Sequence, residues 1–75
     1  MPLEAICPGQ RVEITEIPKN HPLRKRLESF GVLPGREIVC RYTDPKGDLV
    51  ALEILGTVIA ARVSDLRGIL VRSVL

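Results

Sequence analysis

Side chains that could carry acid–base or metal chemistry are few in this chain of 75 residues. The single histidine, His21, lies next to Pro22, and the two cysteines, Cys7 and Cys40, are far apart in the sequence. A general base needs a positioned partner, and the sequence neighbours of His21 supply none. The cysteines lack the close spacing of a zinc knuckle. We interpret His21 as a loop or cap residue and the cysteines as small buried hydrophobes. The residues leave open that these three side chains converge on a divalent transition metal.

Motifs of the common enzyme classes are missing from the sequence. Gly31 and Gly35 bracket a short turn, but neither lysine nor a hydroxyl residue follows it, so it does not match a phosphate-binding loop. The sequence has neither a nucleophile elbow nor a His-Glu-x-x-His zinc motif. Asp44 and Asp48 flank a polar turn, where aspartates usually bond the backbone rather than a cation. We therefore expect a protein that is not an enzyme.

Charge and aromatic content argue against several classes of partner. The net charge is +2, from 11 basic and 9 acidic residues, and the densest basic run is only Arg24-Lys25-Arg26. Nucleic-acid binding needs a larger basic face, so we interpret this run as a solvated helix face. Phe30 and Tyr42 are the only aromatic residues, which is too few for a surface that stacks on bases.

No apolar stretch approaches the ~18 residues of a membrane span. The start of the chain does not resemble a secretory signal, so we expect a cytoplasmic location and no membrane insertion.

Turn signals divide the chain into short elements that must position any functional side chain. Alternating or apolar runs between them predict strands at residues 10–17, 36–42, 49–55, 57–62 and 69–74. In the second run, Ile38, Cys40 and Tyr42 are expected on one face. The predicted turn residues are Pro8, Gly9, Gly31, Pro34, Gly35, Gly47, Asp48 and Gly56.

Two helical segments are expected among the strands. One begins near Pro22 and ends at Gly31, with Leu23, Leu27 and Phe30 along one apolar face. The other is a short helical turn at residues 64–68, capped by Ser64.

Five short strands, one inserted α-helix and a short helical turn before the last strand predict a single, mainly β domain over residues 1–75. We expect the strands to close into a small barrel, because closure removes exposed edges. The last strand and the apolar Val74-Leu75 also leave self-association into a homo-oligomer open.

Several blocks resemble the FeoA family, the small ferrous iron transport protein A. Arg26 to Gly35 is similar to the family's signature, which runs Arg-Leu, two variable residues, Leu or Phe, Gly, an apolar and a variable residue, then Pro-Gly. The other matching blocks are residues 3–9, 46–48, 56–62 and 69–71. Two departures look structural: Leu49 stands where members often have proline, and Ala61 where they usually have leucine.

The resemblance implies an SH3-like barrel and a cytoplasmic accessory role in bacterial ferrous iron uptake. It implies contact with the membrane transporter FeoB and binding of Fe(II) or another divalent transition metal. An alternative is a free-standing metal-sensing domain, related to the SH3-like domain of iron-dependent repressors. A minimal five-stranded barrel does not need the inserted helix, so we predict that Arg24, Lys25, Glu28 and the nearby Arg36 form the partner-binding surface.

Overall fold

Five antiparallel strands form one sheet in the computed structural model of the chain, which describes residues 1–74. The strands are β1 (Arg11–Glu16), β2 (Glu37–Thr43), β3 (Leu49–Ile54), β4 (Thr57–Arg62) and β5 (Leu70–Ser73). The helical segments are η1 (Leu3–Ala5), α1 (Arg24–Ser29) and η2 (Val63–Leu66). The mainly β class and the five strands expected from the sequence are confirmed.

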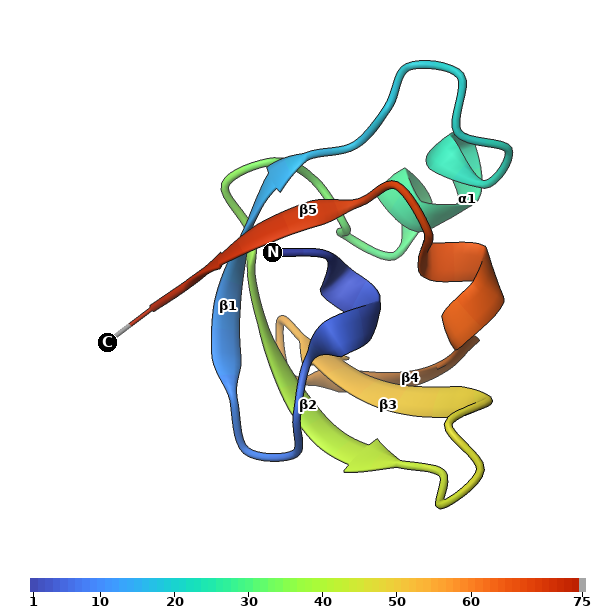
Figure 1. The fold of residues 1–75 in the computed structure, drawn as a ribbon. Coiled ribbons are helices and arrows are strands. Elements are labelled where there is room, and N and C mark those ends of the chain that lie inside the picture. Colours follow the sequence, from blue (N-terminus) through green and yellow to red (C-terminus); the bar gives the residue numbers. More distant parts are fainter. Residues whose placement is uncertain (75) are drawn as a thin grey trace.

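The sheet does not close into a barrel, so the expectation of closure was wrong. The strand order is β4-β3-β2-β1-β5, which leaves β4 and β5 at opposite edges. Figure 1 shows η1 and η2 lying between these two edge strands. The outer edge of β5 pairs instead with the start of the chain, because the N–H of Val71 donates to the carbonyl of Met1 at 2.8 Å. The N–H of Leu3 likewise donates to the carbonyl of Ile69 at 2.9 Å. One edge is thus covered by the N-terminal segment rather than by β4.

The core is aliphatic, and neither aromatic side chain belongs to it. Alternating residues of the strands supply most of the buried set, which includes Leu3, Val12, Ile14, Ile38, Cys40, Leu52, Ile54, Leu66 and Ile69. Tyr42 is 56% exposed and does not share the buried face of Ile38 and Cys40, contrary to the sequence prediction. The register of β2 against β3 shifts between Cys40 and Tyr42, which interrupts the alternation.

Helix α1 is shorter than its apolar pattern predicted. Leu27 is buried and Leu23 packs against the core, but Phe30 is 46% exposed and lies beyond the last helical residue. Gly31, at φ 88°, ends the helix as expected, and the N–H of Val32 donates to the carbonyl of Leu27 at 2.9 Å. The helix therefore anchors through Leu23 and Leu27 and leaves Phe30 at the surface.

Segment η2 begins one residue earlier than the predicted helical turn and lacks the predicted cap. Its N-cap position is Arg62, and no side chain caps it, so Ser64 lies inside the turn. The predicted turn residues, from Pro8 to Gly56, do lie in the connections between elements.

Candidate functional site

Of the three metal candidates, the structure brings Cys7 and Cys40 near each other, because the N–H of Gly9 donates to the carbonyl of Cys40 at 2.7 Å. His21 is half-buried ahead of α1, where its Nδ1 accepts the backbone N–H of Leu23 at 3.1 Å. Cys7 is exposed in the turn before β1, whereas Cys40 is buried in β2. Burial raises the pKa of the Cys40 thiol above its ordinary value, so the protonated form is favoured. Across residues 1–74, no three His, Cys, Asp or Glu side chains gather into a group that could hold a metal ion. The described donor set therefore does not fit a resident metal.

Both aspartates at the β2–β3 turn take part in hydrogen bonds, and Asp44 does so through its side chain, as the sequence suggested. Asp44 Oδ1 accepts the N–H of Lys46 at 3.1 Å, and the carbonyl of Asp44 accepts the N–H of Gly47 at 2.8 Å. The carbonyl of Asp48 accepts the N–H of Val63, which joins this turn to η2. The side-chain bond of Asp44 is the turn-stabilising role expected from the sequence, whereas the bond of Asp48 uses its backbone carbonyl.

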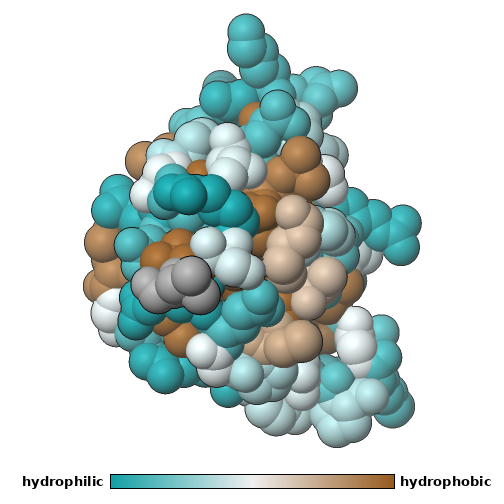
Figure 2. All heavy atoms as spheres, turned by 60° about the vertical axis from the view of Figure 1, so that its left-hand side comes forward, coloured by the Kyte–Doolittle hydropathy of each residue, from teal (hydrophilic) through white to brown (hydrophobic). Residues whose placement is uncertain are grey.

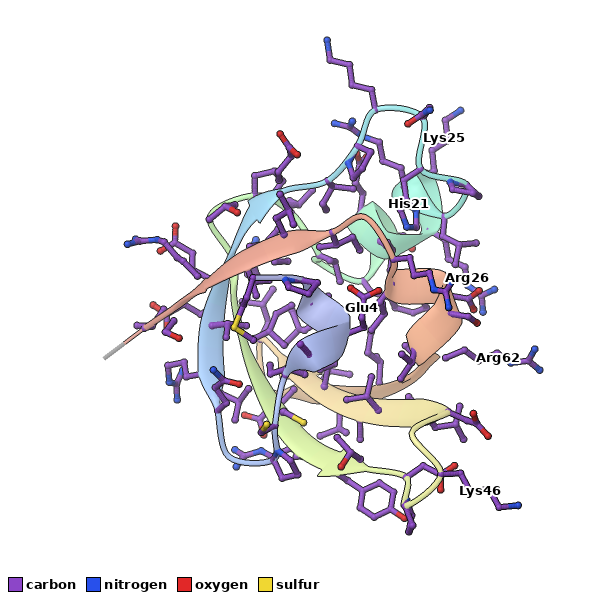
Figure 3. The ribbon with its side chains drawn as sticks, viewed as in Figure 1. Glu4, His21, Lys25, Arg26, Lys46 and Arg62 are labelled. Carbon is purple, nitrogen blue, oxygen red and sulfur yellow. The ribbon has the colours of Figure 1, made fainter. Side chains whose placement is uncertain are left out.

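The predicted partner-binding residues lie on and beside α1. Arg24 Nε and Glu28 Oε1 form an ion pair at 3.0 Å, one turn apart on the helix. Arg36 lies just before β2, where its Nε donates to the carbonyl of Gly31 at 3.2 Å. Lys25 is exposed, and Figure 3 shows it extending from α1 into solvent. The structure therefore brings Arg24, Lys25 and Glu28 together and links Arg36 to the turn that ends the helix.

A groove beside α1 was not anticipated from the sequence. We call it the β4 groove, and its volume is about 470 Å³. Leu23, Leu27 and Phe30 line it from α1 and its ends, and residues 59–62 of β4 with Leu49 of β3 line it from the sheet. Asp65 and Leu66 of η2 lie between them. The adjacent small residues Ala60 and Ala61 were a hint in the sequence that this part of the strand leaves space for a ligand, but only the fold places them opposite α1.

The arginines of β1, β2 and β5 differ from the arginines near the β4 groove in their partners. On the sheet, ion pairs join neighbouring strands: Arg11–Glu37 at 3.3 Å, Arg41–Glu53 at 2.7 Å and Arg72–Glu13 at 2.7 Å. The hydrogen bond and charge of Arg41 hold the pKa of Glu53 below its ordinary value. Figure 2 turns the β1 side forward and shows hydrophilic side chains interspersed with smaller apolar areas.

Arg26 and Arg62, which line the β4 groove, have no such partner. Within the described part of the chain, no carboxylate oxygen lies within 4.0 Å of either guanidinium. A second, neighbouring groove of about 660 Å³ shares Arg62 and adds Lys46 and Arg67, alongside Asp44 and Asp48. The side of the molecule around β4 and η2 therefore carries cations that are free to meet an external carboxylate.

No helix in residues 1–74 has the length and apolar character needed to cross a membrane.

Comparisons with known proteins identify the family and the fold. A family model for the FeoA domain matches residues 1–73. The NMR structure of a FeoA-like protein from Clostridium acetobutylicum is 27% identical and has a TM-score of 0.89, and the match covers 100% of this chain and 87% of that one. No match was found among curated proteins.

Two more distant structures share the fold and were solved with zinc. FeoA from Stenotrophomonas maltophilia is 20% identical with a TM-score of 0.77, over 96% of this chain and 89% of that one. It is described as an SH3 domain protein and a candidate activating factor of bacterial ferrous iron transport. The protein ScaR is 23% identical with a TM-score of 0.85, over 99% of this chain but 37% of that one. The fold is thus SH3-like, and with the family model matching nearly its whole length, the chain belongs to the FeoA domain family.

Proposed function

We propose that this protein is a non-enzymatic accessory protein of bacterial ferrous iron uptake, which acts in the cytoplasm by contacting an FeoB-type membrane transporter. The observation that carries the proposal is the family match over residues 1–73, because this family is associated with ferrous iron transport. The Stenotrophomonas maltophilia protein, described as a candidate activating factor of bacterial ferrous iron transport, supports a role in the same process. The exposed charged side chains on α1 favour contact between proteins, rather than catalysis, as the mechanism.

The contact surface in this proposal is the exposed side of α1 with Arg24, Lys25, Glu28 and Arg36. The internal pair of Arg24 with Glu28 orders two charged side chains before any partner arrives. Ordered side chains lose less conformational entropy on binding, so this arrangement suits a docking face. Lys25 is the exposed cation beside that pair and is the residue best placed to meet an acidic partner.

A pull-down of the FeoB-type transporter from the same cell tests this surface. Lys25→Glu should weaken capture severalfold, since reversal of a peripheral charge mainly slows association. Lys19→Glu, on the exposed loop before α1, makes the same charge change and should leave capture unchanged. Arg24→Glu is less informative by itself because it also breaks the pair with Glu28. Undiminished capture by a Lys25→Glu, Arg24→Glu double variant would refute the surface, and no capture by the unaltered protein would refute the partnership.

Metal sensing is the second candidate function, and zinc in two structures of the same fold is the observation that favours it. It predicts tight binding of Fe(II) or Mn(II) by the isolated chain. The absence of a three-ligand group in residues 1–74 weighs against it. Anaerobic titration calorimetry decides the matter: no heat at about millimolar metal would dismiss metal sensing.

A further inference from the structure

Strand β4 is a free sheet edge whose outward backbone groups can be assigned from its register. Its hairpin with β3 has a two-residue loop, Leu55-Gly56, and Ile54 pairs with Thr57 beside it. In such a hairpin the pair next to the loop exchanges both backbone bonds, and every second pair after it does the same. Ile59 and Ala61 therefore bond to β3, whereas the N–H and C=O of Val58 and Ala60 point away from the sheet.

The two edge strands of the sheet, β5 and β4, differ in whether another segment covers them. The β5 edge is covered by Met1 and Leu3, through the bonds to Val71 and Ile69 described above. No backbone bond from a neighbouring segment to Val58 or Ala60 occurs within residues 1–74. An exposed edge of this kind is a ready template for another strand. β4 is therefore the edge at which a partner can add.

The shape beside β4 favours one extended segment over a second folded sheet. The β4 groove runs along residues 59–62, and its opposite wall is formed by α1 with Leu23, Leu27 and Phe30. A strand that entered the groove would have β4 on one side and the helix on the other. The edge strand of a second copy carries its own sheet behind it, which the helix would obstruct. The volume of about 470 Å³ lies within the range of about 300–1,000 Å³ that is typical of ligand clefts.

The lining of the groove indicates the side chains that such a segment would carry. Ile59 and Ala61 are half-buried and small or aliphatic, so they suit apolar side chains of modest size. Arg26 and Arg62 flank the groove without a carboxylate partner, and Figure 3 shows both extending outward on the same side of the molecule. Asp65 is the acidic residue in the lining and would repel a carboxylate placed beside η2. The chemistry therefore fits carboxylates near the arginines and small apolar residues between them.

We propose that an extended segment of a protein partner, with acidic residues flanking small apolar ones, adds to β4 as a further strand inside the β4 groove. Strand addition derives affinity from backbone bonds and specificity from alternate side chains. The inference rests on the proposed function only in its choice of a protein partner, and the binding mode can be tested without the transporter.

The test is a titration of the full chain, followed by the amide signals in NMR. The probe is a short synthetic peptide with blocked ends in which valine and serine alternate between terminal glutamates. It should shift the signals of Val58 and Ala60 and slow hydrogen exchange at their amides. The same peptide with lysines in place of the glutamates should bind several times more weakly, because it meets Arg26 and Arg62.

Variants of Ala60 separate backbone pairing from other binding modes. Ala60→Pro removes an outward N–H while sparing the bonds to β3, and proline is tolerated at an edge of this kind. It should weaken binding about tenfold, since an N–H to carbonyl bond and close approach are both lost. Ala60→Ser keeps the N–H and is the matched control. Equal binding by the two variants, with circular dichroism showing both folded, would overturn strand addition.

Variants of the arginines test the charge preference. Arg62→Gln and Arg26→Gln should each weaken binding of the acidic probe severalfold, and Lys19→Gln, an equal loss of charge on the exposed loop before α1 and outside both grooves, should not. Absence of shifts in β4 at about 1 mM acidic peptide would also overturn the inference. Peptide binding without capture of the transporter would refute the proposed partnership and leave the groove assignment standing. Capture of the transporter without peptide binding would refute strand addition alone.

Discussion

Gly31 and Gly35, the two glycines of the family signature, provide a sharp test of how backbone conformation stabilises this fold. Both have a φ in the left-handed region, 88° at Gly31 and 90° at Gly35. Their surroundings differ. A Cβ at Gly31 would lie 3.2 Å from Leu55 Cδ1, whereas a Cβ at Gly35 would meet no atom within 4 Å. Alanine at Gly35 therefore reports backbone strain alone, and alanine at Gly31 reports strain together with a close contact.

The magnitudes follow from these two contributions. An L-residue in the left-handed region costs roughly 1–2 kcal/mol, so Gly35→Ala should destabilise the protein by about that amount. Gly31→Ala should cost the same and up to about 1 kcal/mol more, which is the scale of pushing a side chain off its rotamer. The added cost stays small because Leu55 is 69% exposed and its side chain can move.

Urea unfolding followed by far-ultraviolet circular dichroism measures these differences, since a domain of this size is expected to unfold in two states. Each kcal/mol should also lower Tm by about 4–8 °C. Leu55→Gly is the partner variant, because glycine tolerates the φ of 52° at this position and removes the Leu55 side chain that the new methyl group would meet. It should stabilise the parent and remove the additional cost of Gly31→Ala.

Two results would refute this reasoning. If Gly35→Ala changed the unfolding free energy by less than about 0.3 kcal/mol, the left-handed backbone would not be the source of the strain. If the gap between Gly31→Ala and Gly35→Ala persisted in the Leu55→Gly background, the contact with Leu55 would not explain it.

Three further predictions concern the core, pH and thiol reactivity. Leu52→Ala, at a fully buried position of β3, should cost about 2–5 kcal/mol in urea unfolding and leave little of the domain's stability. Because Arg41 lowers the pKa of Glu53, this carboxylate contributes stability that is complete above its ordinary pKa of 4.5 and is lost as the pH falls through the lowered pKa. Arg41→Gln should therefore flatten that part of a curve of unfolding free energy against pH. An unchanged curve would contradict the pairing of Arg41 with Glu53. Iodoacetamide should modify Cys7 in the native protein and Cys40 only after unfolding, so mass spectrometry that finds native modification at Cys40 would contradict its burial.

Local patterns predicted the elements well where the deciding interactions lie close in sequence. The run at residues 57–62 is apolar between Thr57 and Arg62 and follows a glycine turn, and β4 has these same bounds. Gly31 ends α1 because its backbone conformation satisfies the last turn, which is a property of neighbouring residues. The aliphatic core likewise follows from composition, since the strands offer almost nothing but Val, Ile and Leu to bury.

Periodicity failed at Tyr42 and Phe30, and it did not decide whether the metal candidates meet. Tyr42 was expected in the core by alternation, but the register against β3 shifts beside it and leaves it exposed. Phe30 follows the apolar period of α1, yet the helix ends before it. His21, Cys7 and Cys40 could have converged, and only the fold shows that they do not form a three-ligand group in residues 1–74.

By itself, the sequence determined the family, the mainly β class and the order of the elements, because turns, periodicity and capping act over a few residues. Tertiary structure decided which edges meet. The pairing of Met1 and Leu3 with β5 keeps the sheet open, and α1 lies across from β4 to form a groove. Such contacts join residues far apart in the chain, and their free energy depends on competing partners that a local pattern does not specify. The same long-range competition leaves Arg26 and Arg62 without a carboxylate within residues 1–74, while Arg11, Arg41 and Arg72 are paired.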